Sequence, residues 1–191
     1  MNKDRVASFM DAVIAIVMTI LVLELEKPAA PTLAAFWDLR VDFLAYALTF
    51  LWLASMWMSL HNAWQVVNRI STRTIKLSML LLFFSSLFPY ATSLVSEYFY
   101  SKVVQGFYGL IVILTTMMLI LIYNSLADDD RKEWTTAYMT RVNRILMIDV
   151  GIKAAGVVLG LLFWPPLISF GILAAALFTT ITKRHNPVGK I

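Results

Sequence analysis

The sequence predicts an all-α membrane protein with six transmembrane helices in each subunit. The chain has 191 residues, of which 60% are hydrophobic and only 15% are charged. A soluble domain of this length would need a more polar surface than this composition provides. The apolar residues also cluster into runs of about 20 residues, the length that crosses a bilayer as a helix. A single polytopic membrane domain formed by residues 1–191 accounts for both observations.

Polar segments divide the chain into six predicted spans. They cover residues 5–25, 43–64, 77–95, 103–126, 145–164 and 167–181. The third span contains Pro89, and Pro165-Pro166 separates the fifth span from the sixth. Proline cannot continue a helix and disfavours helical backbone in the residue before it. The last two spans are therefore predicted to form a tight hairpin.

Both termini are predicted to be cytoplasmic. An even number of spans brings the two ends of the chain to one side of the membrane. On the opposite side lie only Lys27, Arg40 and Lys102, and Lys153 is inside the fifth span. All the other lysines and arginines, of 16 in the chain, belong to the side with the termini. The positive-inside rule assigns that side to the cytoplasm, so the net charge of +4 indicates topology rather than a nucleic-acid partner.

The sequence lacks the residue types and motifs that are typical of the common enzyme classes. It contains no cysteine, which excludes disulfides and thiolate metal sites, and its only histidines are His61 and His185. No metalloprotease, serine-hydrolase or phosphate-loop pattern occurs. The sequence does not exclude a catalytic intramembrane pair of Asp11 and Asp149, but nothing in it favours such a pair. The chain is therefore predicted to be no enzyme and to hold no cofactor or resident metal.

Residues 9–23 of the first span carry two polar groups among apolar residues, Asp11 and Thr19. At about 100° per residue, one helix face contains the following side chains, with Thr19 at its edge: Phe9, Ala12, Ile16, Ile20 and Leu23. Asp11 lies about 140° around the helix from Ile16 and points away from that face. This helix is therefore predicted to combine an apolar face with a polar contact on another side.

Ionisable groups inside membrane spans are costly and are candidate functional groups. Asp149 and Lys153 are four residues apart on one helix, which suits mutual neutralisation, and the alternative is a proton or ion relay. Asp11 and His61 lie toward the inner ends of their helices and could meet, and Arg5 is a second candidate partner for the carboxylate. That contact would be either a structural clasp or a pH-sensing switch.

Two short motifs have ordinary structural interpretations. Gly106-Phe107-Tyr108-Gly109 is similar to the core of a potassium selectivity filter, but the lead-in residues and the preceding pore helix are missing. Its glycines are interpreted as sites of close helix packing. The acidic run Asp128-Asp129-Asp130 is interpreted as a solvated loop or helix cap, with a metal site as the alternative.

The first two spans carry a family signature. Arg5-x-x-x-Phe9-Met10-Asp11-Ala12, continued through Ile16, Thr19 and Leu21-Val22-Leu23-Glu24-Leu25, resembles the first helix of the bacterial branch of the transmembrane protein 175 family. Trp57 and His61 match that family's tryptophan and histidine in the second span. Met10 replaces the serine that is usual in the signature, so any hydrogen bond of that serine is lost here.

The resemblance implies a potassium-permeable channel in a bacterial cell membrane, without a carbonyl filter. It implies a homotetramer of six-helix subunits, in which four first helices line a central pore that potassium ions cross without a resident metal. Ile16, Ile20 and Leu23 would match the hydrophobic constriction, and Thr19 would match a threonine layer. The inter-helix network that holds the first helix would consist of Arg5, Phe9, Asp11, Trp57 and His61.

Physical arguments support these roles. A narrow apolar neck closes by losing its water, and a ring of hydroxyls beside it replaces part of an ion's hydration shell. Glu24 and Glu26, at the outer end of the same helix, would concentrate cations at the mouth. Without the signature, ordinary helix packing would explain the apolar stripe. The alternatives are a proton- or ion-coupled secondary transporter that uses Asp11, His61, Asp149 and Lys153, and a membrane scaffold without a pore.

Overall fold

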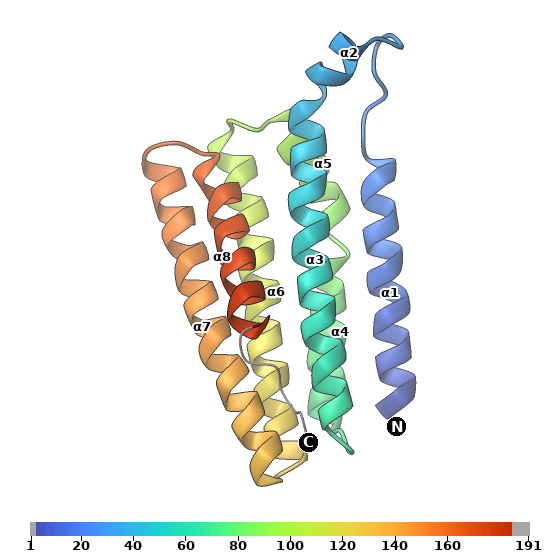
Figure 1. The fold of residues 1–191 in the computed structure, drawn as a ribbon, viewed down its shortest axis with the longest axis vertical. Coiled ribbons are helices and arrows are strands. Elements are labelled where there is room, and N and C mark those ends of the chain that lie inside the picture. Colours follow the sequence, from blue (N-terminus) through green and yellow to red (C-terminus); the bar gives the residue numbers. More distant parts are fainter. Residues whose placement is uncertain (1–2, 185–191) are drawn as a thin grey trace.

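The computed structural model describes residues 3–184, and within them it contains helices and turns but no strand. The predicted inner-side residues beyond Arg184 lie outside the described part. The helices are α1 (Lys3–Leu23), α2 (Leu33–Asp38), α3 (Arg40–Val66), α4 (Thr72–Ser85), α5 (Phe88–Glu97), α6 (Lys102–Asp129), α7 (Glu133–Leu162) and α8 (Leu167–Arg184). All except the short α2 run roughly along the same long axis (Figure 1).

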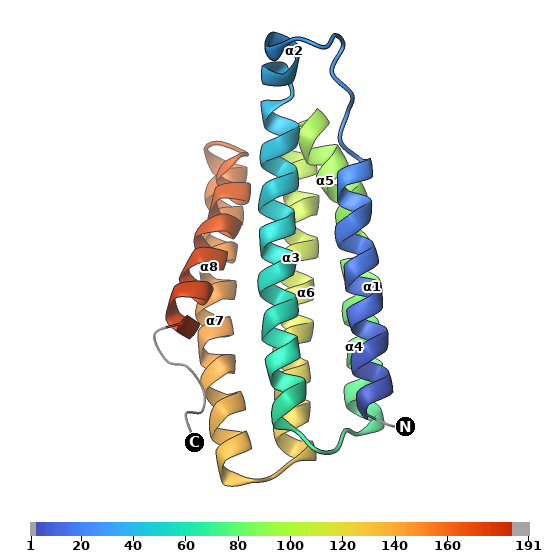
Figure 2. The same cartoon turned by 45° about the vertical axis from the view of Figure 1, so that its right-hand side comes forward.

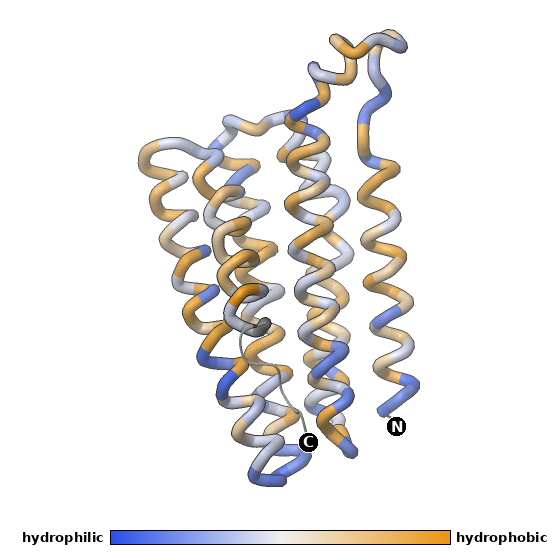
Figure 3. Tube along the Cα trace, viewed as in Figure 1, coloured by the Kyte–Doolittle hydropathy of each residue, from blue (hydrophilic) through white to orange (hydrophobic). Residues whose placement is uncertain are grey.

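Five helical segments are long and apolar enough to cross a membrane. They are α1, α3, the segment Thr72–Glu97 that comprises α4 and α5, α6 and α7, while α8 is a shorter apolar helix. Figure 3 shows apolar colours along these helices and hydrophilic colours at the end of the bundle that carries the N-terminus. The all-helical prediction is thus confirmed, and five of the six predicted spans meet the length of a membrane span.

The helices differ from the predicted spans at two places, and one short helix was not predicted. The third span consists of two helices, because α4 ends at Ser85 and α5 begins at Phe88, with Pro89 in its first turn. Proline cannot donate a backbone hydrogen bond to the preceding turn, so the helix restarts there. The helix of the fifth predicted span, α7, begins at Glu133 rather than near residue 145, because Met139 and Val142 pack against the bundle. The short α2 was not predicted, and Thr32 caps it by accepting a hydrogen bond from the Ala35 backbone N–H (3.3 Å).

α1 lies at the edge of the bundle and contacts α3, α4 and α5 on one side only. Figures 1 and 2 show it on the opposite side of the bundle from α7. The residues that α1 buries recur every three or four positions and form a single stripe: Val6, Met10, Ile14, Val17 and Leu21. The rest of the α1 surface is therefore not covered by its own subunit.

α7 and α8 form the predicted hairpin around Pro165 and Pro166. A Cβ atom built on Gly156 would lie 3.2 Å from the Cα atom of Gly171, so the two backbones touch at these glycines. Small residues at such crossings let membrane helices approach closely. The hairpin packs in turn against α6, and α8 also contacts α3.

The acidic run forms a set of caps at the end of the bundle that carries the N-terminus. The Asp129 carboxylate accepts hydrogen bonds from the Ser71 backbone N–H (2.7 Å) and the Thr74 hydroxyl (2.6 Å), at the start of α4. Asp130 accepts one from the Asn68 backbone N–H (3.1 Å). Carboxylates are favourable at a helix N-terminus, because unpaired N–H groups point outward there. This arrangement supports the cap interpretation of the run.

Candidate pore-lining face and buried polar centre

The face of α1 that the helical periodicity singled out points away from the rest of the subunit. Ile16 is 57% exposed and Leu23 is 79% exposed, although both are large apolar residues on a helix. Phe9, Thr19 and Ile20 are exposed beside them. A row of exposed apolar side chains along a whole helix requires a cover, since water would not stabilise it. These side chains therefore face lipid, contact another subunit or line a pore.

Between Phe9 and Leu23, Thr19 is the one hydroxyl on this face. Its Oγ1 atom donates a hydrogen bond to the backbone carbonyl of Ile16 at 2.8 Å. This bond occupies the hydroxyl proton and leaves the oxygen lone pairs free to accept or to coordinate a cation. The exposed side of Thr19 is therefore an oxygen acceptor rather than a donor.

Trp57, and not His61, is the direct partner of Asp11. The Trp57 indole N–H donates to Asp11 Oδ1 at 2.8 Å, which ties α1 to α3. The predicted direct contact between Asp11 and His61 was wrong, because the Trp57 indole N–H occupies the carboxylate and the His61 ring contacts Trp57 instead. His61 joins indirectly: its ring lies 5.4 Å from the Trp57 ring, and its Nε2 atom is 3.3 Å from Gln65 Nε2.

Arg5 and Phe9 lie in the N-terminal half of α1. Both are exposed. Among the described ion pairs none joins Arg5 to Asp11, so Arg5 does not serve as the predicted partner of that carboxylate within one subunit. The predicted network therefore reduces here to Asp11, Trp57 and His61.

Lys3 is a contact that the sequence analysis missed. Its Nζ atom donates to the backbone carbonyls of Trp64 (3.2 Å) and Val67 (2.9 Å), at the end of α3. The last carbonyls of a helix have no partner within the helix and carry partial negative charge, so an ammonium group is favourable there. α1 is thus attached to α3 at two levels, by Lys3 and by Asp11. A lysine in the first helical turn was the only signal in the sequence.

Glu24 and Glu26 follow α1 instead of belonging to it. The helix ends at Leu23, and both glutamates are exposed in the connection to α2. Their carboxylates therefore follow the C-terminal end of the exposed α1 face and lie on a loop, not on the helix as predicted.

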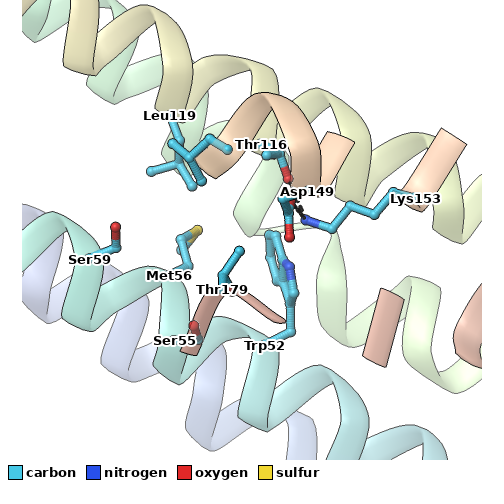
Figure 4. A pocket seen from close by; sticks show the side chains of 10 residues that line it. Trp52, Ser55, Met56, Ser59, Thr116, Leu119, Asp149, Lys153 and Thr179 are labelled. Carbon is cyan, nitrogen blue, oxygen red and sulfur yellow. Dashed lines mark hydrogen bonds and ion pairs between the residues drawn. The ribbon is translucent and has the colours of Figure 1, made fainter. Parts of the chain in front are cut away.

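A second polar centre lies inside the bundle (Figure 4). The Lys153 ammonium forms an ion pair with Asp149 and donates a hydrogen bond to Thr116 Oγ1 at 2.8 Å. It also lies 5.1 Å from the centre of the Trp52 ring, within range of a cation–π interaction. Both charged side chains are almost completely buried. A carboxylate, a hydroxyl and an aromatic face together compensate this buried ammonium.

The ion pair borders a small cavity of about 20 Å³, enough for one water molecule. Its lining residues come from α3, α6, α7 and α8: Trp52, Ser55, Met56, Ser59, Thr116, Leu119, Leu146, Asp149, Lys153 and Thr179. Among these, Asp149 and Lys153 are the only ionisable groups. A relay needs a further titrating group within reach of the pair, so this geometry favours the interpretation of mutual neutralisation.

The glycine-aromatic-glycine motif is part of a regular helix. Residues 106–109 lie in the first turns of α6, and the Tyr108 hydroxyl is 2.9 Å from the Thr49 hydroxyl. A Cβ atom built on Gly109 would lie 2.9 Å from side-chain atoms of both Ile168 and Val157. The motif therefore packs α6 against the α7–α8 hairpin, as the sequence analysis proposed.

Comparisons with known proteins agree with the family resemblance. The family model described as endosomal/lysosomal potassium channel TMEM175 matches residues 5–89. A potassium channel of Chryseobacterium sp. (strain P1-3) is 30% identical over 124 residues, 65% of each chain. A potassium channel of Streptomyces collinus (strain DSM 40733 / Tue 365) is 29% identical over 122 residues, 59% of each chain. The aligned part thus covers less than two thirds of either relative.

A solved structure shares the fold. The crystal structure of a lysosomal potassium-selective channel TMEM175 homolog from Chamaesiphon minutus aligns with 96% of this chain and 98% of its own, with a TM-score of 0.81 and 20% sequence identity. The segment matched by the family model contains α1 from Arg5 onward, α3 and α4, and therefore the exposed α1 face from Phe9 to Leu23 and the Asp11–Trp57 contact. The resemblance predicted from the first two spans is confirmed.

Proposed function

We propose that this chain, whose residues 5–89 match the TMEM175 family model, forms a potassium-permeable channel whose pore is lined by α1. The observation that carries the proposal is the uncovered α1 face, a row of apolar side chains with one hydroxyl. The names of the two bacterial relatives, both potassium channels, support the choice of ion and a bacterial cell membrane as the location.

One subunit offers a single pore-lining helix, so several copies have to assemble. We propose a homotetramer in which four α1 helices surround the axis. α8 serves as the sixth span, because its 18 residues reach about 27 Å, close to the thickness of the hydrocarbon core. Six spans place both termini in the cytoplasm, which agrees with the basic residues at the inner end of the bundle.

Ile16, Ile20 and Leu23 form the constriction in this proposal. Each contributes one ring of four apolar side chains, and a narrow apolar ring excludes water and ions until it widens. Thr19 lies between the first two rings, and its outward lone pairs replace part of the hydration shell of a potassium ion. Glu24 and Glu26 raise the cation concentration at the outer mouth.

The inner half of α1 is held in place by its contacts with α3. The Asp11–Trp57 hydrogen bond and the Trp57–His61 ring contact fix one level, and Lys3 fixes a second level closer to the N-terminus. Arg5 and Phe9, which are exposed in one subunit, contact the neighbouring subunit in the assembled channel. Movement of α1 relative to α3 is then the motion that widens the constriction.

The first test measures ion flux into liposomes that contain the purified protein, under a potassium gradient and again under a sodium gradient. A potassium flux well above the sodium flux supports the proposal. Ile16→Asn is expected to raise the flux, because an amide ring holds water in the constriction. Val22→Asn, an equal change on α1 but about 120° from Ile16 around the helix, is expected to leave it unchanged.

Other outcomes separate the alternatives. Equal fluxes of both ions would retain a channel and remove potassium selectivity. Potassium uptake that occurs only with opposite proton movement would favour a secondary transporter, for which the buried Asp149–Lys153 pair is the candidate coupling group. No flux from folded, inserted protein would overturn the channel and leave a scaffold.

A further inference from the structure

The exposed face of α7 has basic residues near one end and an apolar stripe along the rest, and neither takes part in the proposed pore. Arg141 and Arg144 are exposed there. They border a surface hollow on the inner segment of α7, lined by Glu133, Thr136, Ala137, Thr140, Arg141 and Arg144. Three residues apart, the two arginines lie on one side of the helix, and among the described side chains neither is in an ion pair.

The same face continues as an exposed apolar stripe toward the other end of α7. Met147 is 61% exposed and Val158 is 55% exposed, and Ile148 and Leu162 are exposed along the same stripe. In Figures 1 and 2, α7 lies at the side of the bundle away from α1. This arrangement suits contact with lipid, with the arginines at the boundary where the apolar stripe ends.

A notch interrupts the stripe at Gly151. A Cβ atom built on this glycine would have no neighbour within 4 Å, in contrast to the crowded Gly156 one and a half turns further on. Ala154 and Ala155 continue the surface with small side chains, and both are exposed. The notch begins about 10 Å from Arg144 along the helix axis, which is within reach of an acyl chain whose headgroup is at the arginine.

We propose that this face binds an anionic phospholipid, with the phosphate group between Arg141 and Arg144 and an acyl chain over Gly151. Guanidinium groups form paired hydrogen bonds with phosphate oxygens, and basic sites at the cytoplasmic end of membrane helices bind anionic headgroups. A second copy of α7 is a poorer occupant, because it would bring two more unpaired guanidinium groups against the first two. Glu133 lies about two turns from Arg141, farther from the apolar stripe, and leaves the phosphate site positive. The inference requires that α7 crosses a bilayer, but not that the chain conducts potassium.

The test compares binding of phosphatidylglycerol and phosphatidylcholine, with identical acyl chains, to the purified full-length protein by native mass spectrometry during a lipid titration. The parent protein is expected to prefer phosphatidylglycerol. Arg141→Gln/Arg144→Gln is expected to weaken phosphatidylglycerol binding by about tenfold, since each basic residue near an anionic lipid contributes a few-fold. The control Arg69→Gln/Lys76→Gln removes two exposed charges from the same end of the bundle and is expected to change binding by less than about twofold.

Gly151→Leu tests the acyl part with both arginines intact. The substitution fills the notch without meeting a neighbour and replaces a residue that disfavours helices, so the fold is retained. It is expected to weaken the binding of phosphatidylglycerol. Unchanged phosphatidylglycerol preference in both α7 variants would overturn the proposal. Equal losses in the α7 and control double variants would overturn it by showing a general charge effect, and so would a changed oligomeric state in Gly151→Leu, which would assign the face to subunit contacts.

Discussion

Lys153 carries a charge in the middle of the bundle, and its partners come from three different helices. The ammonium contacts Asp149 on its own helix, Thr116 on α6 and the Trp52 ring on α3. The four-residue spacing of Asp149 and Lys153 was visible in the sequence, and it predicted the ion pair. Thr116 and Trp52 could not be assigned to it, because their approach depends on how distant helices pack.

Removal of one member of this pair is expected to destabilise the protein strongly. Lys153→Met leaves the Asp149 carboxylate buried without a counterion, which costs about 3–5 kcal/mol in comparable buried pairs. Asp149→Asn/Lys153→Met removes both charges and is expected to lie closer to the parent. Unfolding midpoints in detergent measure the difference. If Lys153→Met were as stable as the double variant, groups other than Lys153 would have to compensate the buried Asp149 carboxylate.

Thr19 is the residue on which ion discrimination depends in the proposed pore. Thr19→Ala removes the only side-chain oxygen between the Ile16 and Ile20 rings and is expected to reduce the preference for potassium over sodium. Thr19→Ser keeps the hydroxyl and is expected to retain most of that preference. Reversal potentials in mixed potassium and sodium solutions measure both variants. The same reversal potential for Thr19→Ala and the parent would remove Thr19 from the selectivity mechanism.

At the scale of elements, α1 and the α7–α8 hairpin show how one helix presents two different faces. α1 buries one stripe on α3, α4 and α5 and leaves the other uncovered, while its inner end is attached to α3 by Lys3 and Asp11. α7 uses glycines to approach α8 on one side and exposes Gly151 on the other. The position of each glycine therefore decides its role, although their chemistry is the same.

Alanine substitutions at two glycines of α7 are expected to have opposite effects. Gly156→Ala places a methyl group 3.2 Å from the Gly171 Cα atom and 3.4 Å from the Leu167 carbonyl oxygen, and backbone atoms cannot easily move away. We expect a loss of about 1–3 kcal/mol from this overpacking. Gly151→Ala meets no neighbour and is expected to gain about 0.5–1 kcal/mol from reduced backbone freedom in the unfolded chain. Thermal unfolding of the two variants compares them directly, and equal shifts would contradict the packing of the hairpin.

At the scale of the whole molecule, the proposed channel exists only as an assembly. A single subunit exposes its pore face, and the apolar rings acquire a function when several copies meet at one axis. Because the chain contains no cysteine, single cysteines can report which faces meet. Leu23→Cys is expected to form disulfide-linked dimers on mild oxidation in the membrane, since four copies of residue 23 surround the axis. Val158→Cys, on the outer face of α7, is expected to remain monomeric on denaturing gels.

The reverse pattern of cross-linking would place α7 rather than α1 at the subunit contact. The mass of the complex in detergent gives a second measurement, and four subunits are expected. A homogeneous monomer in both detergent and lipid would contradict the pore, because one α1 helix cannot enclose a conduit.

The sequence by itself determined the properties that depend on local composition and period. Apolar runs of membrane-spanning length predicted the helices, and the 3.6-residue period of α1 defined its apolar face, although the period alone did not show whether that face would be covered. The signature from Arg5 to Asp11, with Trp57 and His61, indicated the family. Pro89 was recognised as a possible break, but the sequence pattern could not distinguish a bend from the observed restart of the helix at Phe88.

The tertiary structure alone decided which distant side chains meet. It selected Trp57 rather than His61 as the donor to Asp11, and it attached Lys3 to the end of α3. It also brought Thr116 and Trp52 to Lys153 and extended α7 over the polar segment before residue 145. The reason is physical: helix period and hydrophobicity are properties of neighbouring residues, whereas these contacts depend on the relative height and rotation of packed helices. That register is set by the summed packing of many side chains, which no short stretch of sequence contains.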